Sequence, residues 1–221
     1  MVDFSNVKQV EIPEGKVKSI SSNGIILWKL DEGGLPAEYQ QVEYIQSNGN
    51  QYIDTGISGN AIGEYEIKLN ALGSQAHSWE QYFAGNRDTS SLVGKLYCSS
   101  YKVMYQGYPS SSDIEFGSYS NTIEAKVLRS TGIVSNGLYK SAYGGAPWGA
   151  LTFYIFNSHS EPTLGASMRL YYLKMYSDGE LVRDYIPCYR KSDSVIGLYD
   201  LVSRTFNTNQ GSGSFTKGGD V

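Results

Sequence analysis

Short runs of alternating apolar and polar residues, separated by tight-turn dipeptides, recur along the whole chain. Asn23-Gly24, Asn136-Gly137 and Asp178-Gly179 each separate two such runs. Asn-Gly and Asp-Gly favour the type I′ turn of a two-residue β-hairpin, because both central residues of that turn need a positive φ. No segment keeps a helical period over eleven or more residues. The pattern therefore predicts an all-β protein, built as an antiparallel sandwich or barrel.

The first 34 residues form a separate segment in this interpretation. Their short β-type runs end in the apolar stretch Ile25, Ile26, Leu27 and Trp28, which predicts a small three-stranded meander. A unit of this size hardly buries a core alone, so Ile25, Leu27 and Trp28 are expected to attach it to a neighbour. Glycines and a proline near residue 34 mark a break. We expect an attachment segment and linker at 1–34 and the main domain at 35–221.

The stretch "MYSDGELVRDYIPC" (175–188) gathers charged residues beside a cysteine and raises the question of catalysis. Its pattern instead predicts two strands around an Asp178-Gly179 turn. Leu170, Tyr172 and Lys174 are expected on one face of the first strand, and Tyr171, Leu173 and Met175 on the other. On the return strand Arg183 and Asp184 are expected to point to opposite faces. We therefore interpret the charges as a turn and a structural ion pair.

Composition and charge exclude several classes of function. The net charge is −4, which argues against a nucleic-acid partner. No run of about eighteen apolar residues exists, so no membrane span is expected. The N-terminus lacks the pattern of a signal peptide, so export by a signal-peptide route is not expected. Cys98 and Cys188 lie far apart without metal spacing, and we expect two unpaired thiols.

Tyrosine dominates the aromatic residues, with 19 Tyr against 7 Phe and 3 Trp. Tyrosine suits strands, and it also suits recognition surfaces because it is rigid and amphipathic. Together with 25 Gly and many Ser and Asn, this composition is typical of turn-rich β proteins and of binding loops.

Two terminal blocks resemble a known family. "LPAEYQQVEYIQSNGNQYIDTGI" (35–57) and "MRLYYLKMYSDGELVRDYIPCYRKSDSVIGLYDLVSRTFNTNQGSGSF" (168–215) resemble concanavalin A-like, LamG-type jelly-roll domains of gut Firmicutes and their phages. The resemblance covers roughly residues 35 to 215. It implies a two-sheet antiparallel jelly-roll sandwich whose chain ends pair near each other.

The segment "VEIPEGKVKSISSNGIILWKL" (10–30) resembles short segments at the head of phage virion-associated proteins. This second resemblance implies synthesis in the bacterial cytoplasm, docking on other virion proteins and a place on the surface of the phage particle. The expected partners are therefore virion proteins and bacterial surface glycan, bound by an oligomer or by many copies.

Enzyme motifs are weak in this sequence. Glycoside hydrolysis needs two carboxylates on one sugar, and the nearest pairs are Glu64 with Glu66 and Asp113 with Glu115. The first pair is expected on a solvated face and the second on an exposed edge or loop. The two histidines, His77 and His159, are expected in loops, and no nucleophile motif surrounds a serine. We predict no catalytic residue.

Two segments expected to be loops suit carbohydrate binding, which needs an aromatic face for the sugar and polar groups for its hydroxyls. "HSWEQYFAGNRD" offers Trp79, Tyr82, Asn86 and Arg87, and "YKSAYGGAPWGA" offers Tyr143 and Trp148. Either tryptophan could instead cap the core or fill a subunit interface.

No cofactor is expected. Calcium stays open by family analogy, with Asn86, Asp88 and Asp193 as isolated loop oxygens. The Gly/Ser-rich "GSGSFTKGG" (211–219) is expected to be a flexible tail, because no helix follows that could bind a phosphate.

The sequence thus predicts a phage virion-associated protein that displays a lectin-like domain for non-covalent binding of the host surface. The alternative is a capsid or tail decoration protein that cements the particle and has no ligand. A third hypothesis, a depolymerase, requires two carboxylates in one groove.

Overall fold

The computed structural model divides the chain into two compact units, Met1–Gly34 and Leu35–Val221. It describes residues 9–11, 19–22, 25–29, 34–72, 81–87, 93–99, 102–106, 114–118, 121–129, 132–135, 138–141, 150–157 and 165–221.

The first unit contains a three-stranded antiparallel sheet in the order β1-β2-β3. Its strands are β1 (Gln9–Glu11), β2 (Ser19–Ser22) and β3 (Ile25–Lys29). Ser22 lies opposite Ile25 in the ladder, so two residues join β2 to β3. The predicted attachment residues Ile25, Leu27 and Trp28 all lie on β3, and their side chains are outside the described part of the chain.

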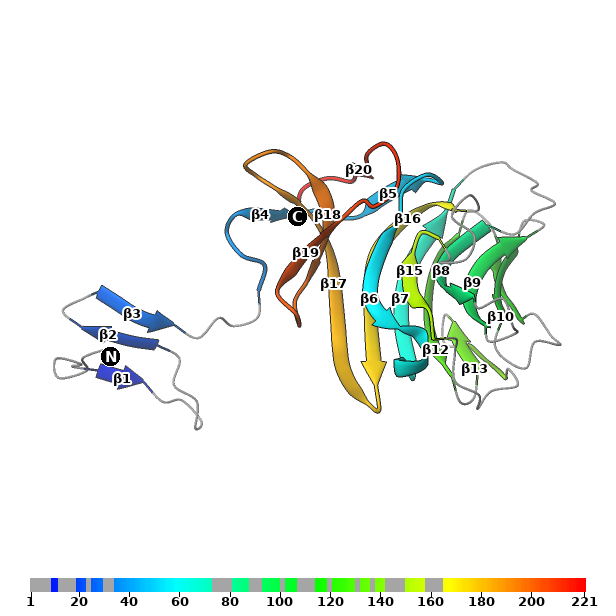
Figure 1. The fold of residues 1–221 in the computed structure, drawn as a ribbon, viewed down its shortest axis with the longest axis horizontal. Helices are drawn as coiled ribbons and strands as arrows, with labels where there is room; N and C mark the ends of the chain where they lie inside the picture. Colours follow the sequence, from blue (N-terminus) through cyan, green and yellow to red (C-terminus); the bar gives the residue numbers. More distant parts are fainter. Residues whose placement is uncertain are drawn as a thin grey trace. The chain divides into compact units, whose positions relative to one another are not determined.

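Two antiparallel sheets make up the second unit (Figure 1). The small sheet has the order β11 (Ile114–Ser118), β10 (Lys102–Gln106), β9 (Val93–Ser99), β8 (Gln81–Arg87), β15 (Thr152–Ile155) and β6 (Ile53–Ser58). A short 3₁₀ turn, η1 (Gly59–Ala61), leads from β6 towards the other sheet.

The large sheet has the order β14 (Leu138–Ser141), β13 (Gly132–Ser135), β12 (Thr122–Leu128), β7 (Glu64–Ala71), β16 (Ser167–Ser177), β17 (Glu180–Arg190), β18 (Ile196–Asp200) and β19 (Thr205–Thr208). Three short strands extend it: β4 (Tyr39–Gln41) pairs with β17, β5 (Ile45–Asn48) pairs with β16, and β20 (Thr216–Lys217) pairs with β5.

The core lies between the two sheets. Strand β7 shows the alternation expected of a half-buried strand, with Tyr65, Ile67, Leu69 and Ala71 buried and the intervening residues partly exposed. Tyr65 of the large sheet meets Phe153 of the small sheet edge to face, with ring centroids 5.3 Å apart. The fold is therefore an all-β, two-sheet antiparallel sandwich, and the predicted fold class is confirmed at this level.

The β16–β17 hairpin closes as predicted. Asp178 and Gly179 have φ values of 49° and 84°, which is the signature of a type I′ turn, and Ser177 lies opposite Glu180. The charges of this stretch thus serve a turn and its flanking strands.

The predicted alternation along β16 is wrong at its middle. Leu170 and Leu173 were expected on opposite faces, but both are fully buried. The register to β7 shifts between Leu170 and Tyr172, where a β-bulge inserts one extra residue. Tyr171 and Tyr172 consequently both lie outside the core.

Both ends of the second unit meet at one edge of the large sheet. Val42 and Asp220 form an antiparallel bridge. The backbone N–H of Val221 donates to the carbonyl of Gln41, and Gln40 Nε2 donates to the carbonyl of Val221, both at 3.1 Å. The C-terminal residues are therefore part of the sandwich.

Candidate functional site

Most of the ligand residues predicted from the sequence have side chains outside the described part of the chain. Trp79, Tyr143 and Trp148 lie outside the described residues, as does Asp88. Tyr82, Asn86 and Arg87 lie on β8, between β9 and β15, and their side chains are not described. The segment 81–87 is thus a strand of the small sheet, whereas the ligand hypothesis treated it as part of a loop.

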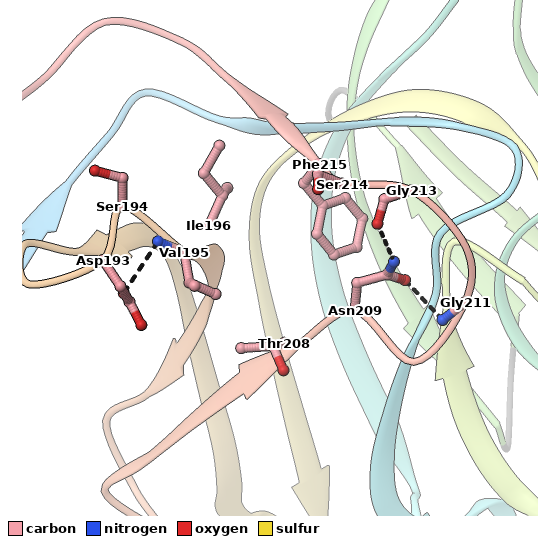
Figure 2. Close-up of a pocket in the computed structure, with 10 residues that line it drawn as sticks. All are labelled: Asp193, Ser194, Val195, Ile196, Thr208, Asn209, Gly211, Gly213, Ser214 and Phe215. Carbon is pink, nitrogen blue, oxygen red and sulfur yellow. Dashed lines mark hydrogen bonds between the residues drawn. The ribbon is translucent and has the colours of Figure 1, made fainter.

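A different site is visible at the β17–β18 end of the sandwich. A pocket of about 420 Å³ lies between the turn that joins β17 to β18 and the segment that joins β19 to β20 (Figure 2). Its volume is in the range of small-ligand sites. The lining residues are Asp193, Ser194, Val195, Ile196, Thr208, Asn209, Gly211, Gly213, Ser214 and Phe215.

The pocket combines apolar and hydroxyl groups. Val195, Ile196 and Phe215 supply apolar surface, and Phe215 packs on Phe156 in the core with ring centroids 5.0 Å apart. The hydroxyls of Ser194, Thr208 and Ser214 form no side-chain hydrogen bond with any described residue. An apolar wall beside unengaged hydroxyls suits a ligand that has both kinds of surface.

Asn209 holds the loop on one side of the pocket in shape. Its Oδ1 accepts hydrogen bonds from the backbone N–H of Gly211 at 2.8 Å and of Tyr52 at 3.1 Å. Its Nδ2 donates to the carbonyl of Gly213 at 2.9 Å (Figure 2). Because Tyr52 leads into β6, one amide side chain ties the loop both to itself and to the other sheet.

The loop also packs tightly on the chain beneath it. A Cβ added to Gly211 would lie 2.1 Å from the carbonyl oxygen of Asn50, so this position accepts only glycine without movement. Buried Gln51 donates from Nε2 to the carbonyl of Ser212 at 3.0 Å, and Ser212 N–H donates to the Asn50 carbonyl at 3.1 Å. The predicted flexible tail is therefore wrong from its first residues, because side-chain and backbone hydrogen bonds fix the segment.

A salt bridge fixes the opposite side of the pocket. Arg190 Nη2 lies 2.6 Å from Asp193 Oδ2, and Arg190 Nε lies 3.1 Å from both carboxylate oxygens. The backbone N–H of Val195 donates to Asp193 Oδ1 at 3.2 Å. These bonds, above all the one from Arg190, lower the pKa of Asp193. Asp193 is thus a charge-compensated rim group and not a proton donor at neutral pH.

The charged residues of the β16–β17 hairpin serve the fold. Arg183 Nε lies 3.2 Å from Oδ2 of Asp200, a carboxylate that is fully buried. Asp200 also accepts hydrogen bonds from the N–H groups of Asp184 and Val202 and from the Ser203 hydroxyl. The predicted structural ion pair exists, although its acid comes from β18 and not from the hairpin itself.

Of the four carboxylates considered for glycoside hydrolysis, two form ion pairs, one is exposed and one is outside the described residues. Glu64 and Glu66 both bind Lys126 Nζ, at 2.5 Å and 3.4 Å, on the partly exposed face of the large sheet. Glu115 lies exposed on β11, whereas Asp113 is outside the described residues.

The described residues contain neither a metal-binding cluster nor a membrane-spanning helix. Within that part of the chain, His, Cys, Asp and Glu nowhere gather in threes as a metal site would need. The same residues contain no helix with the length and apolarity needed to cross a membrane. Cys188 is a free, buried thiol whose pKa burial raises to about 12, so it is not a reactive group.

Apart from Asp193, which was considered only as a calcium ligand, the pocket residues were missed because their sequence context looks like turn and tail. Phe215 was the available signal, since a single aromatic residue in a Gly/Ser-rich segment must pack somewhere. Comparisons with protein-family models and with curated proteins found no match for this chain.

Proposed function

We propose that this protein is a non-catalytic recognition protein of a phage particle, whose sandwich binds a saccharide unit of the bacterial surface in the pocket between residues 193–196 and 208–215. The observation that carries the proposal is the composition of this pocket. Unengaged hydroxyls line it beside apolar side chains, and two hydrogen-bonded segments hold its walls.

A saccharide matches these features because its ring has apolar C–H faces and hydroxyl edges. Ser194, Thr208 and Ser214 can each donate and accept a hydrogen bond with a sugar hydroxyl. Ile196 and Phe215 offer the apolar contact. Arg190 compensates the charge of Asp193, which favours a neutral ligand over a cation.

We also propose that the sandwich has a jelly-roll topology and that the protein is attached to the phage particle. The resemblance of 35–57 and 168–215 to LamG-type domains supports a concanavalin A-like jelly roll, and the pairing of both chain ends with the large sheet agrees with it. The resemblance of residues 10–30 to phage segments supports attachment to the virion through the first unit. Display in many copies would multiply weak binding at each pocket.

Titration with oligosaccharides released from Gram-positive cell walls tests the proposal. Thr208→Val and Ser214→Ala each remove one hydroxyl, and each is expected to weaken binding about tenfold by isothermal calorimetry. Ser192→Ala is the matched control, because Ser192 lies in the same turn as Asp193 without lining the pocket.

Equal affinities in all four proteins would show that the pocket is not the site. Absence of any saccharide binding, together with particles that fall apart without this chain, would favour the decoration role instead. Cleavage of the oligosaccharides during the titration would favour the depolymerase hypothesis.

A further inference from the structure

The outer face of the large sheet, opposite the core, carries a series of ion pairs between neighbouring strands. Lys68 pairs with Glu124 at 3.8 Å, Lys126 with Glu64 and Glu66, and Lys174 with Asp184 at 3.8 Å. These residues face one another across β12, β7, β16 and β17. Pairs of this kind are typical of a solvated sheet face and need no functional explanation.

Arg169 on β16 differs from these charged residues, because it forms no ion pair with a described carboxylate. It lies on the same face, opposite Asn70 of β7 and Gln46 of β5. Its Nε donates to Gln46 Oε1 at 3.0 Å, but no carboxylate among the described residues pairs with it. The Nη1 and Nη2 groups, which form the outer end of the guanidinium, make no hydrogen bond within that same part of the chain.

The guanidinium of Arg169 is nevertheless held in place. Its Cζ lies 4.5 Å from the ring centroid of Tyr44, within the range of a cation–π contact. With Nε fixed by Gln46 and the plane fixed by Tyr44, the side chain loses little further freedom on binding. A positioned guanidinium whose two Nη groups bind no described residue matches the two oxygens of a carboxylate or phosphate.

Two tyrosines and a second cation surround this group. Tyr171 contacts Tyr44 edge to face, with centroids 5.6 Å apart, and Lys68 Nζ lies 5.9 Å from the Tyr171 centroid. Tyr171 reaches this face because of the bulge in β16. We name Tyr44, Gln46, Lys68, Arg169 and Tyr171 the Arg169 patch.

The charge of the Arg169 patch is positive although the chain as a whole is acidic. Glu124 compensates Lys68 and also accepts a hydrogen bond from the Tyr172 hydroxyl at 2.8 Å. Among the described residues no carboxylate compensates the charge of Arg169, which lies beside aromatic rings that can cover an apolar ligand surface.

We infer that the Arg169 patch binds an oxyanion, a carboxylate or a phosphate, carried by a surface polymer. The patch shares no residue with the pocket of residues 193–215, so it can bind an oxyanion whether or not that pocket binds a saccharide. The ligand class is an acidic glycan or a polyol phosphate, and both present a singly charged oxyanion next to apolar C–H groups.

Three probes distinguish the sources: an oligosaccharide that contains glucuronic acid, a glycerol phosphate oligomer, and a neutral oligosaccharide. The full chain is expected to bind at least one anionic probe in calorimetry, more weakly at high salt, because a partly exposed charge is screened. Binding of only the first probe assigns an acidic sugar, and binding of only the second assigns a phosphate. Binding of neither overturns the inference.

Variants connect the binding to the patch. Arg169→Gln is expected to weaken binding of the anionic probe by about tenfold or more. Arg169→Lys keeps the charge but loses the planar fork, so an intermediate loss is expected. Tyr44→Leu removes the ring under the guanidinium and is expected to weaken binding while Arg169 remains.

Lys191→Gln is the matched control, since Lys191 is an exposed cation outside the patch that donates to the Ala37 carbonyl. Its affinity for the anionic probe is expected to equal that of the unaltered chain. An equal loss in Lys191→Gln and Arg169→Gln, or equal affinity for the neutral probe, would overturn the inference. Thermal unfolding of each variant checks that the sandwich is intact, and Tyr44→Leu provides a second test if Arg169→Gln unfolds.

Discussion

The β17–β18 hairpin carries an arginine–aspartate pair at each end. Both pairs join a guanidinium to a carboxylate, but they differ in burial and in the hydrogen bonds around them. Arg183 binds Asp200, whose side chain is 0% exposed and accepts three further hydrogen bonds. Arg190 binds Asp193, and both of these side chains are about two-fifths exposed. Burial, rather than the pairing of residue types, therefore decides whether such a pair stabilises the fold or shapes the surface.

The buried pair organises the backbone around it. Asp200 collects the N–H groups of Asp184 and Val202, which belong to different segments of the chain. The exposed pair instead sets the position of the turn that forms one wall of the pocket. Removing each partner in turn should therefore have very different effects.

The largest effect is expected for Asp200→Ala. It leaves Arg183 without its acid and two backbone N–H groups without an acceptor, so the free energy of unfolding should fall by about 3–5 kcal/mol. Urea denaturation followed by circular dichroism measures this change. Asp200→Asn, which keeps some acceptors, should lose less. A loss below about 1 kcal/mol in Asp200→Ala would contradict the structural role of the pair.

A smaller loss is expected for Gly211→Ala in the wall opposite Asp193. The new Cβ would meet the Asn50 carbonyl oxygen at 2.1 Å, so the loop must move, at a cost of about 1–3 kcal/mol. Saccharide binding should fall as the pocket changes shape. Gly34→Ala is the control, because an added Cβ there has no heavy atom within 4 Å. Equal stability of the two variants would show that the loop yields easily.

Cys188 lies on β17 between the two arginines, and its buried thiol should make stability depend on pH in the alkaline range. Burial raises the pKa of its thiol from 9.0 to about 12, so the unfolded chain releases this proton first as the pH rises. Its contribution to stability is complete below about pH 9 and is lost between that pH and about pH 12. Between about pH 8 and about pH 10, Cys188→Ala should therefore lose about 1 kcal/mol less stability than the unaltered chain. Parallel curves for the two proteins would contradict the prediction.

The smallest change in stability is expected for Asp193→Asn. Both members of this pair are exposed, and water and salt screen their attraction, so the unfolding curve should hardly move. Saccharide affinity should nevertheless fall several-fold, because Arg190 loses its partner and the wall loses its position. Urea unfolding and calorimetry on the same sample separate the two effects. A large loss of stability would place Asp193 in the same class as Asp200.

Arg190 also determines the pH at which Asp193, in the β17–β18 turn beside the pocket, becomes protonated. It lowers the pKa of Asp193, so the carboxylate stays charged below the ordinary range of an aspartate. The stability from this pair is present above the ordinary pKa and is lost as the pH falls through the lowered one. Saccharide binding should accordingly persist in mildly acidic buffer and weaken only at lower pH.

Much of the fold could be predicted because its signals are local. Tyr65, Ile67 and Leu69 alternate with charged residues, and this alternation directly predicts a strand with one buried face. The Asp178-Gly179 turn needs only its own two φ values. The bulge in β16 has a signal in the sequence, because the buried residues shift from even to odd numbers between Leu170 and Leu173. The predicted alternation was wrong there because it continued across this position unchanged.

The pocket could not be predicted because its parts meet through contacts between distant residues. Asn209 reaches the backbone of Tyr52, 157 positions away, and Gln51 reaches Ser212, 161 positions away. A Gly/Ser-rich stretch has no periodicity that would show such bonds. The predicted Trp79 and Trp148 ligand residues stay predictions, as does the attachment role of Trp28.

The hydrogen bonds that join residues 40 and 41 to Val221 have a consequence for engineering. Because the two ends of the sandwich are adjacent, a linker of a few residues should close this unit into a ring. Reopening the ring at the exposed Asp178–Gly179 turn would give a circular permutant with the same sheets in a new chain order. The sandwich should in that form be graftable into a surface loop of an unrelated protein.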